Sequence, residues 1–331
     1  RFSGVDEAVA KLHIEDILAK EESLPATDLT WALPVVEADP KGGGLWLRGL
    51  YERNFVTHIP VVIMNRMNFG TTSYEVGIDD PRLPVIAMPT KYKDYRGVSM
   101  NSDAQTPGYN AGDRYYPFAD NLTLSLQQNA KSLYSHVTYT YNKFPAYMMS
   151  LAEVDLLLAE VALKNLANTG KAASDHMHDA VTHSIHFWYN INALSSYASN
   201  LADAEFKALL RPAKPSNTII TGYAQTVKDN FEAQVSDEDK MEVLMQQKYI
   251  HINLIEPYDL FTDLRRTRHP KLEPMTFGGK VMRPTPERLR YPQSEFETNT
   301  ENYLKVKDQD NFTSHVFWVP ENKRTESYYQ E

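Results

Sequence analysis

The sequence predicts a mainly α-helical protein that carries one large loop-rich insertion. Four segments repeat apolar residues at helical spacing, at about 5–20, 146–165, 174–191 and 236–255. Residues 91–145 are instead rich in Asn, Asp, Ser, Gly and Tyr and show little periodicity. With 331 residues, 42% of them hydrophobic, the chain is long enough to bury a substantial core around such helices.

The first predicted helix runs from Val5 to Lys20, after Ser3, which has the side chain of a helix N-cap. Its apolar residues fall near a single stripe, so the helix is amphipathic. The residues of this stripe are Val5, Ala8, Val9, Leu12 and Ile17. A second helical stretch is expected from about Leu45 to Phe69, with an interruption at Pro60.

The centre of the fold is predicted at Ala146–Asn165, which is apolar on nearly every side and therefore typical of a buried helix. A turn at Asn168-Thr169-Gly170 follows, and Ser174 opens another helix with an apolar stripe from Met177 to Ile191. Two helices joined by a short turn form an αα-hairpin.

A later helix is predicted from Ser236, which begins the capping sequence Ser236-Asp237-Glu238-Asp239, to about Ile255. Pro257 should end or kink the helical path, because proline lacks the amide hydrogen that an interior helix position requires. Beyond Pro270, recurrent Pro and Gly favour an extended, loop-rich tail.

Composition excludes several classes of function. The chain has 34 Lys plus Arg against 43 Asp plus Glu, so it offers no basic surface for nucleic acid. It has no cysteine, which excludes disulfides, thiolate catalysis and cysteine zinc sites. No apolar run reaches the roughly 18 residues of a membrane span. No phosphate-binding loop, dinucleotide fingerprint or nucleophile elbow is present, so no cofactor is predicted.

Two helical segments carry a resemblance to a known family. The first is Leu151-Ala152-Glu153-Val154 with Ala159-Glu160. The second is Gln247-Lys248 with Ile250 and the run from Glu256 to Pro270. Both resemble the signature helices of the SusD/RagB family of surface nutrient-binding lipoproteins. Three further segments agree with one branch of it. They are Asp80-Pro81-Arg82-Leu83-Pro84, Tyr95-Arg96-Gly97-Val98 and Arg290-Tyr291-Pro292-Gln293-Ser294-Glu295-Phe296-Glu297-Thr298-Asn299. One departure is Pro257, where alanine is usual.

The resemblance implies a SusD-like fold of tetratricopeptide-type helical pairs. Residues 1–331 would form a single domain, with an insertion at 91–145, a helical framework at 146–262 and an extended segment at 263–331. It also implies a location on the outer face of the outer membrane and a partnership with a SusC-like TonB-dependent transporter. Because Arg1-Phe2-Ser3-Gly4-Val5-Asp6 matches an internal segment of family members, further helical pairs and a lipid anchor are expected before it.

Two glutamates of the central helix, Glu153 and Glu160, are expected to be buried and each to meet a cation or a backbone amide, since an unpaired buried charge costs several kcal/mol. The candidate partners are Lys248, Arg265 and Arg266. A catalytic pair of carboxylates is disfavoured, because seven helical residues separate the two by ~10.5 Å along the axis. Glycosidases hold their carboxyls roughly 5 to 9.5 Å apart.

The best candidate for a ligand site is an aromatic cluster in the insertion. Flat rings stack on the apolar faces of sugars, while amides and carboxylates satisfy hydroxyl groups, and a peptide would fit such a surface nearly as well. The predicted ligand-binding residues are Tyr109, Asn110, Asp113, Tyr115, Tyr116 and Trp188. The alternative is that the tyrosines fix the loop to the helical body, and Trp188 lies in the core stripe of its helix.

The leading hypothesis is a non-catalytic protein that captures an oligosaccharide or a peptide for the transporter. A surface glycoside hydrolase and a protein-interaction scaffold are the alternatives. A zinc site at Asp179, His183 and His186 is a weak possibility from their helical spacing, and no metal is predicted.

Overall fold

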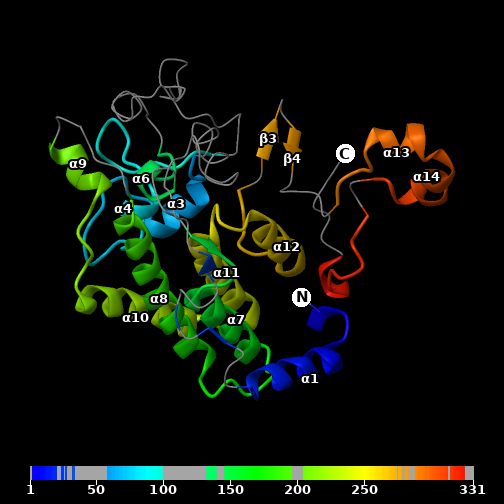
Figure 1. The fold of residues 1–331 in the computed structure, drawn as a ribbon, viewed down its shortest axis with the longest axis horizontal. Coiled ribbons are helices and arrows are strands. Elements are labelled where there is room, and N and C mark those ends of the chain that lie inside the picture. Colours follow the sequence, from blue (N-terminus) through cyan, green and yellow to red (C-terminus); the bar gives the residue numbers. More distant parts are fainter. Residues whose placement is uncertain are drawn as a thin grey trace.

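The computed structural model describes residues 2–20, 24–25, 27, 32–33, 58–99, 132–139, 145–195, 204–273, 275–277, 280–282, 288–311 and 314–324. Within these ranges the protein is mainly helical, as predicted. Figure 1 shows a body built around α7, α8, α10, α11 and α12, with α1 at its lower edge and the pair α13–α14 at the opposite side from α9. The two described pairings of strands are short antiparallel ones.

The body is centred on the predicted αα-hairpin, formed by α7 (Leu151–Leu163) and α8 (Ala173–Ala193). These helices pack along their length, and the turn between them uses positive φ angles at Asn165 and Gly170. The helix α7 begins later than predicted because Ser150 is its N-cap, with Oγ accepting a hydrogen bond from the Glu153 amide at 3.2 Å. The residues before it form β2 (Ala146–Tyr147), which pairs with β1 (Ala32–Leu33).

Two further helices flank the hairpin. The helix α10 (Asn217–Ala233) packs on α8. It was not predicted from the sequence, although Ser216 caps it. The helix α11 (Asp237–Ile252) packs against α7. Its predicted cap at Ser236 is confirmed, because the Asp239 amide donates a hydrogen bond to Ser236 Oγ. The predicted break at Pro257 is also confirmed, because this residue begins the separate helix α12 (Pro257–Thr267).

The amino-terminal helix is α1 (Glu7–Leu18), and it begins at a different cap from the predicted one. Asp6, rather than Ser3, accepts a hydrogen bond from the Val9 amide, at 3.0 Å. The predicted stripe is largely solvent-exposed, with Leu12 65% and Ile17 46% accessible. The helix is amphipathic, but among its residues only Ala10 is buried.

The remaining described elements are short. They are η1 (Phe2–Gly4), α3 (Val61–Met67), α4 (Leu83–Ile86), α6 (His136–Tyr139), α9 (Ala204–Leu210), β3 (Met275–Phe277), β4 (Lys280–Met282), α13 (Gln293–Thr298), α14 (Thr300–Val306), η4 (Lys307–Gln309) and η5 (Glu321–Lys323). Pro60, the predicted interruption, is the N-cap of α3.

The carboxy-terminal part differs from the extended segment predicted for 263–331. The boundary itself falls inside α12, and beyond it lie a β-hairpin and the helices α13 and α14. Local side-chain bonds four residues apart support these helices, such as Gln293 to Glu297 and Asn299 to Glu295. The helices α13 and α14 have only 6 and 7 residues, which is too short for a clear helical period.

A fully buried arginine ties α4 to the hairpin. Arg82 forms an ion pair with Asp80 at 2.6 Å, and neither side chain is more than 1% exposed. Its guanidinium also donates to Ser184 Oγ of α8 at 3.0 Å and to Gln247 Oε1 of α11 at 2.6 Å. One charge therefore fixes the position of three elements that are far apart in the sequence.

The segment around Gly97 packs so closely against α3 that no side chain fits at this position. A Cβ atom at Gly97 would lie 2.4 Å from the Val61 Cα atom. This close approach allows the Val61 amide to donate to the Val98 carbonyl at 2.8 Å. Glycine is required at this position because any other residue would force the two backbones apart.

The variant Arg82→Met should lower the free energy of unfolding by about 3 to 5 kcal/mol, because it leaves the Asp80 carboxylate buried without its partner. Urea unfolding followed by circular dichroism measures this change. Arg96→Met is a matched control, since Arg96 pairs with Asp94 at the same sequence spacing but is 38% exposed. That control should cost at most about 1 kcal/mol. Equal losses in the two variants would contradict the role given to Arg82.

Candidate functional site

The predicted ligand-binding cluster of the insertion lies outside the described residues. This applies to Tyr109, Asn110, Asp113, Tyr115 and Tyr116. The described flanks of the insertion lie side by side, because the Ser132 amide donates to the Arg96 carbonyl at 2.8 Å. On the other side, the Ile59 amide donates to the Ser132 carbonyl at 3.0 Å. The framework therefore holds both flanks of the insertion at one place.

The assignment of Trp188 as a ligand contact is wrong. Its side chain is 0% exposed, and its ring packs against those of Tyr139 and Phe187, with centroid distances of 5.2 Å in both cases. The stripe on α8 that contains Trp188 faces the core, so this ring stabilises the fold and cannot meet a ligand.

Glu160 forms the predicted kind of buried ion pair. Its carboxylate accepts two hydrogen bonds from the Arg266 guanidinium, and the one between Nη2 and Oε2 is 2.9 Å long. Lys164, one turn further along α7, also donates to Glu160, at 2.6 Å. The two cations hold the pKa of Glu160 well below its usual range despite burial. The pair joins α7 to α12.

The other predicted cations meet different partners. Lys248 donates to Asp263 at 2.6 Å, and Asp263 also pairs with Arg266 at 2.8 Å. Arg265 lies over the rings of Phe261 and Trp318, at 4.1 and 4.6 Å from their centroids, rather than against either glutamate. Asp263 was not among the predicted residues, although its position three residues before Arg266 on one helix is typical of a local ion pair.

The expectation of an ion pair for Glu153 is wrong within the part of the chain that the structure describes. Its side chain is 8% exposed, and its carboxylate lies close to those of Glu256 and Asp259. Burial raises the pKa of Glu153 to about 7, Lys248 opposes this rise, and the neighbouring carboxylates add to it. The expected partner Lys248 is engaged by Asp263 instead.

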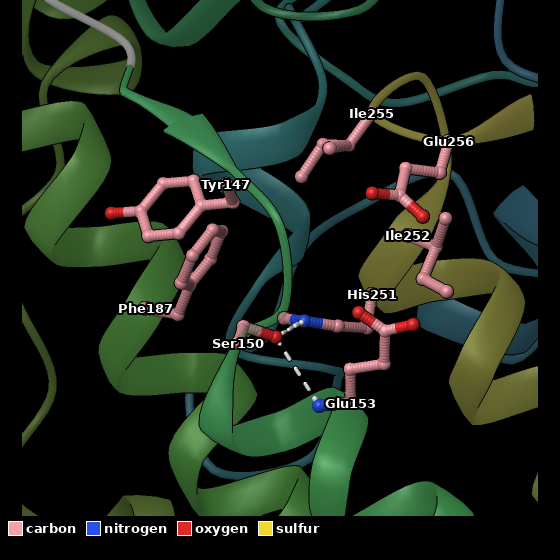
Figure 2. A pocket seen from close by; sticks show the side chains of 8 residues that line it. All are labelled: Tyr147, Ser150, Glu153, Phe187, His251, Ile252, Ile255 and Glu256. Atoms are coloured by element: carbon pink, nitrogen blue, oxygen red, sulfur yellow. Dashed lines mark hydrogen bonds between the residues drawn. The ribbon is translucent and has the colours of Figure 1, made fainter. Parts of the chain in front are cut away.

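A small pocket beside Glu153 contains a serine–histidine contact (Figure 2). Ser150 Oγ lies 2.7 Å from His251 Nε2, and His251 Nδ1 lies 2.9 Å from Ser184 Oγ. The pocket has a volume of about 10 Å³, which is room for one water molecule and excludes a sugar ring.

This contact lacks the features of a nucleophilic centre. His251 is 2% exposed, and burial together with Arg82 and Lys248 lowers its pKa to about 3. No carboxylate orients the imidazole, because both ring nitrogens meet serine hydroxyls. The hydroxyl of Ser150 also serves as the cap of α7. We interpret the contact as a structural link between α7, α8 and α11.

A larger cavity, of about 720 Å³, lies between α1 and α7. Its wall is mainly aliphatic, with Ile14 and Ile17 from α1 and Leu157, Leu158 and Val161 from α7. The ion pairs of α7, α11 and α12 lie at one border of it. The volume suits a small molecule or an apolar segment of a protein, and the charged side chains of its lining come from α7, α11 and α12.

The candidate zinc ligands are engaged elsewhere. His183 Nδ1 lies 2.6 Å from the Asp155 carboxylate on α7, and Asp179 accepts from Lys171 at 2.6 Å. Among the described residues, the only triad of possible metal ligands with suitable spacing is Glu153, Glu256 and Asp259.

These features define a helical framework built on buried ion pairs, and its fold has known relatives. A SusD homolog from Bacteroides uniformis is 20% identical, with a TM-score of 0.62; the match covers 96% of this chain and 61% of that one. A structure described as a chitin-binding protein is 21% identical, with a TM-score of 0.55 and the same coverage. A SusD homolog from Bacteroides vulgatus is 17% identical, with a TM-score of 0.59, over 96% and 59% of the two chains. A comparison with curated proteins gave no match.

Residues 52–319 match the SusD-like family, described as SusD and RagB outer membrane lipoproteins. The chain belongs to this family, as its sequence motifs predicted, and it spans about three fifths of the length of the first two structures above. The family consists of non-catalytic binding proteins. None of the described helices combines the length and the hydrophobicity that a membrane crossing requires.

The variant Glu160→Gln should lower the free energy of unfolding at pH 7 by about 3 kcal/mol, the lower end of the range for breaking a buried pair, because Arg266 keeps Asp263. The pKa of Glu160 is depressed in the fold, so its contribution is fully present above about pH 4.5. It should decline by about 1.4 kcal/mol per pH unit below that value.

Urea unfolding of both proteins between pH 7 and pH 3.5 measures this difference. Glu232→Gln is the control, since Glu232 is 50% exposed and lies 3.9 Å from Lys228 on the surface of α10. It should change stability by at most about 1 kcal/mol. A loss for Glu160→Gln that does not depend on pH would rule out the ionised carboxylate as its cause.

Proposed function

We propose that this chain is part of a non-catalytic cell-surface protein that captures an oligosaccharide or a peptide and passes it to a SusC-like TonB-dependent transporter of the outer membrane. The observation that carries the proposal is the match of residues 52–319 to the SusD and RagB lipoprotein family. Delivery to a transporter accounts for a binding protein on the outer face of that membrane.

The chemistry of the helical body supports binding over hydrolysis. Within the described residues, Glu160 is paired with Arg266, and Ser150 and His251 are buried and line a pocket too small for a substrate. A glycoside hydrolase needs two carboxyls that face a substrate cleft. The framework supplies rigid packing, so recognition is expected on side chains that it displays.

We infer that the ligand surface lies on the insertion at 91–145. Its described flanks are joined to each other by the hydrogen bond from the Ser132 amide to the Arg96 carbonyl. The sequence of that segment combines Tyr109, Tyr115 and Tyr116 with amides and carboxylates, a mixture that suits sugar rings. Because one structure of similar fold is a chitin-binding protein, oligosaccharides of N-acetylglucosamine are a rational first probe.

A protein-interaction scaffold is the second candidate, and the cavity between α1 and α7 favours it. Its aliphatic wall could take an apolar segment of another protein. This role requires no aromatic ligand surface, so the two candidates differ in which residues matter for binding.

Replacing Tyr109, Tyr115 and Tyr116 together by alanine should abolish measurable binding of the cognate ligand. Loss of one stacking ring is expected to cost about 1 to 3 kcal/mol, by analogy with bases on aromatic side chains, which is about five- to 150-fold in affinity. A glycan and peptide array identifies the ligand, and isothermal titration calorimetry with the full chain measures its affinity.

The control is Tyr258→Ala, which removes a tyrosine that is 85% exposed on α12 and should leave affinity unchanged. Circular dichroism should show equal helical content in all the variants. Unchanged affinity in the triple variant would place the site elsewhere. Sustained hydrolysis of the ligand by the pure protein would contradict the non-catalytic assignment.

A further inference from the structure

Three carboxylates from two helices converge beside the pocket of Figure 2. Glu153 lies in the first turn of α7, Glu256 is the N-cap residue of α12, and Asp259 lies in the first turn of α12. One oxygen atom from each lies within 4.8 Å of one from each of the others. Figure 2 shows the carboxylates of Glu153 and Glu256 pointing toward each other across the pocket.

Glu153 is the member of this cluster that is buried without a direct partner. The residue is buried, with 8% of its surface exposed, and within the described parts of the chain its carboxylate has no hydrogen-bond donor and no ion pair. Lys248 acts on it electrostatically, but the ammonium group of Lys248 is bonded to Asp263 at 2.6 Å. A buried carboxylate without a direct partner costs several kcal/mol, so a cation in contact with Glu153 would stabilise the fold.

The donor set indicates which cation would fit. All three donors are carboxylate oxygens, which suits a hard cation better than zinc or copper. The nearby imidazole of His251 is not available, since its two ring nitrogens meet Ser150 and Ser184. Calcium binds oxygen at about 2.3 to 2.6 Å, so two ligands on opposite sides of it lie at most about 5 Å apart. Spacings of up to 4.8 Å fit this requirement.

We propose that Glu153, Glu256 and Asp259 bind a calcium ion that links the amino-terminal ends of α7 and α12. Water completes the coordination shell, because calcium takes six to eight oxygen ligands and Glu256 and Asp259 are only half-buried. Magnesium fits less well, since it demands near-ideal octahedral geometry, loses its water reluctantly and is seldom held in a site built from protein carboxylates alone.

The ion adds a second cross-link between the same two helices. Arg266 joins α12 to Glu160 in the last turns of α7, whereas the calcium site joins α12 to Glu153 in the first turn. Because the two links lie at opposite ends of α7, they fix the angle between α7 and α12 as well as the distance between them. The alternative is that Glu153 is protonated and shares its proton with a neighbouring carboxylate, in which case no cation binds.

The test is calorimetric titration of the full chain with calcium chloride, after treatment with a chelator and its removal. We expect one site with a dissociation constant of roughly 10⁻³ M or tighter, the range of extracellular calcium modules, and weaker binding of magnesium. Calcium should also raise the midpoint of thermal unfolding, because an ion that binds the folded state stabilises it.

Glu256→Gln and Asp259→Asn should each weaken calcium binding at least tenfold, and both remain able to fold because neither residue is fully buried. Asp237→Asn is the matched control, since Asp237 also lies in the first turn of a helix but is exposed and outside the triad. It should leave binding unchanged. Affinity retained in both triad variants, or absence of binding up to about 10 mM calcium, overturns the proposal. In that case Glu153 is protonated and shares its proton with a neighbouring carboxylate. The variant Glu153→Gln, which is neutral at every pH, should then raise the free energy of unfolding, and calcium should have no effect on it.

Discussion

The packing of the helical body depends on one buried cation, the guanidinium of Arg266. A charge taken out of water must meet opposite charge within the fold, and Arg266 meets Glu160 of α7 and Asp263 of its own helix. Asp263 in turn binds Lys248 of α11, so three helices share one chain of ion pairs. Because each carboxylate has to reach its cation, the helices have one register in which all of these charges are satisfied. Arg82 imposes the same constraint on α4, α8 and α11.

The sequence predicted the parts of this fold that local chemistry decides. The central hairpin follows from an apolar helix beside an amphipathic one, and Ser236 and Pro257 mark helix starts because capping and proline geometry act within a few residues. Periodicity predicted the apolar stripe of α1, but much of that stripe is exposed, because periodicity does not report what covers a stripe. The helices α13 and α14 were missed because they are too short for a clear period.

The candidate site could be predicted only in part. Burial of Glu153 and Glu160 followed from the apolar helix around them, but the choice of partners depended on tertiary distances. Lys248 pairs with Asp263, so Glu153 lies among carboxylates instead of beside a cation. No sequence pattern reports which of two carboxylates pairs with a given lysine. Trp188 shows the opposite error: its position in a helical stripe was evidence for the core, and its residue type suggested a ligand contact. The aromatic cluster of the insertion stays a prediction that binding measurements must decide.

The central claim is that Glu160 and Arg266 act as one unit in holding α7 against α12. A double-mutant cycle tests it most directly, with Glu160→Gln, Arg266→Met and the double variant compared by urea unfolding at pH 7. Our account predicts that the double variant loses less stability than the two single losses combined, by at least about 2 kcal/mol, because removing both partners leaves neither charge buried alone. Losses that add within about 0.5 kcal/mol would contradict it.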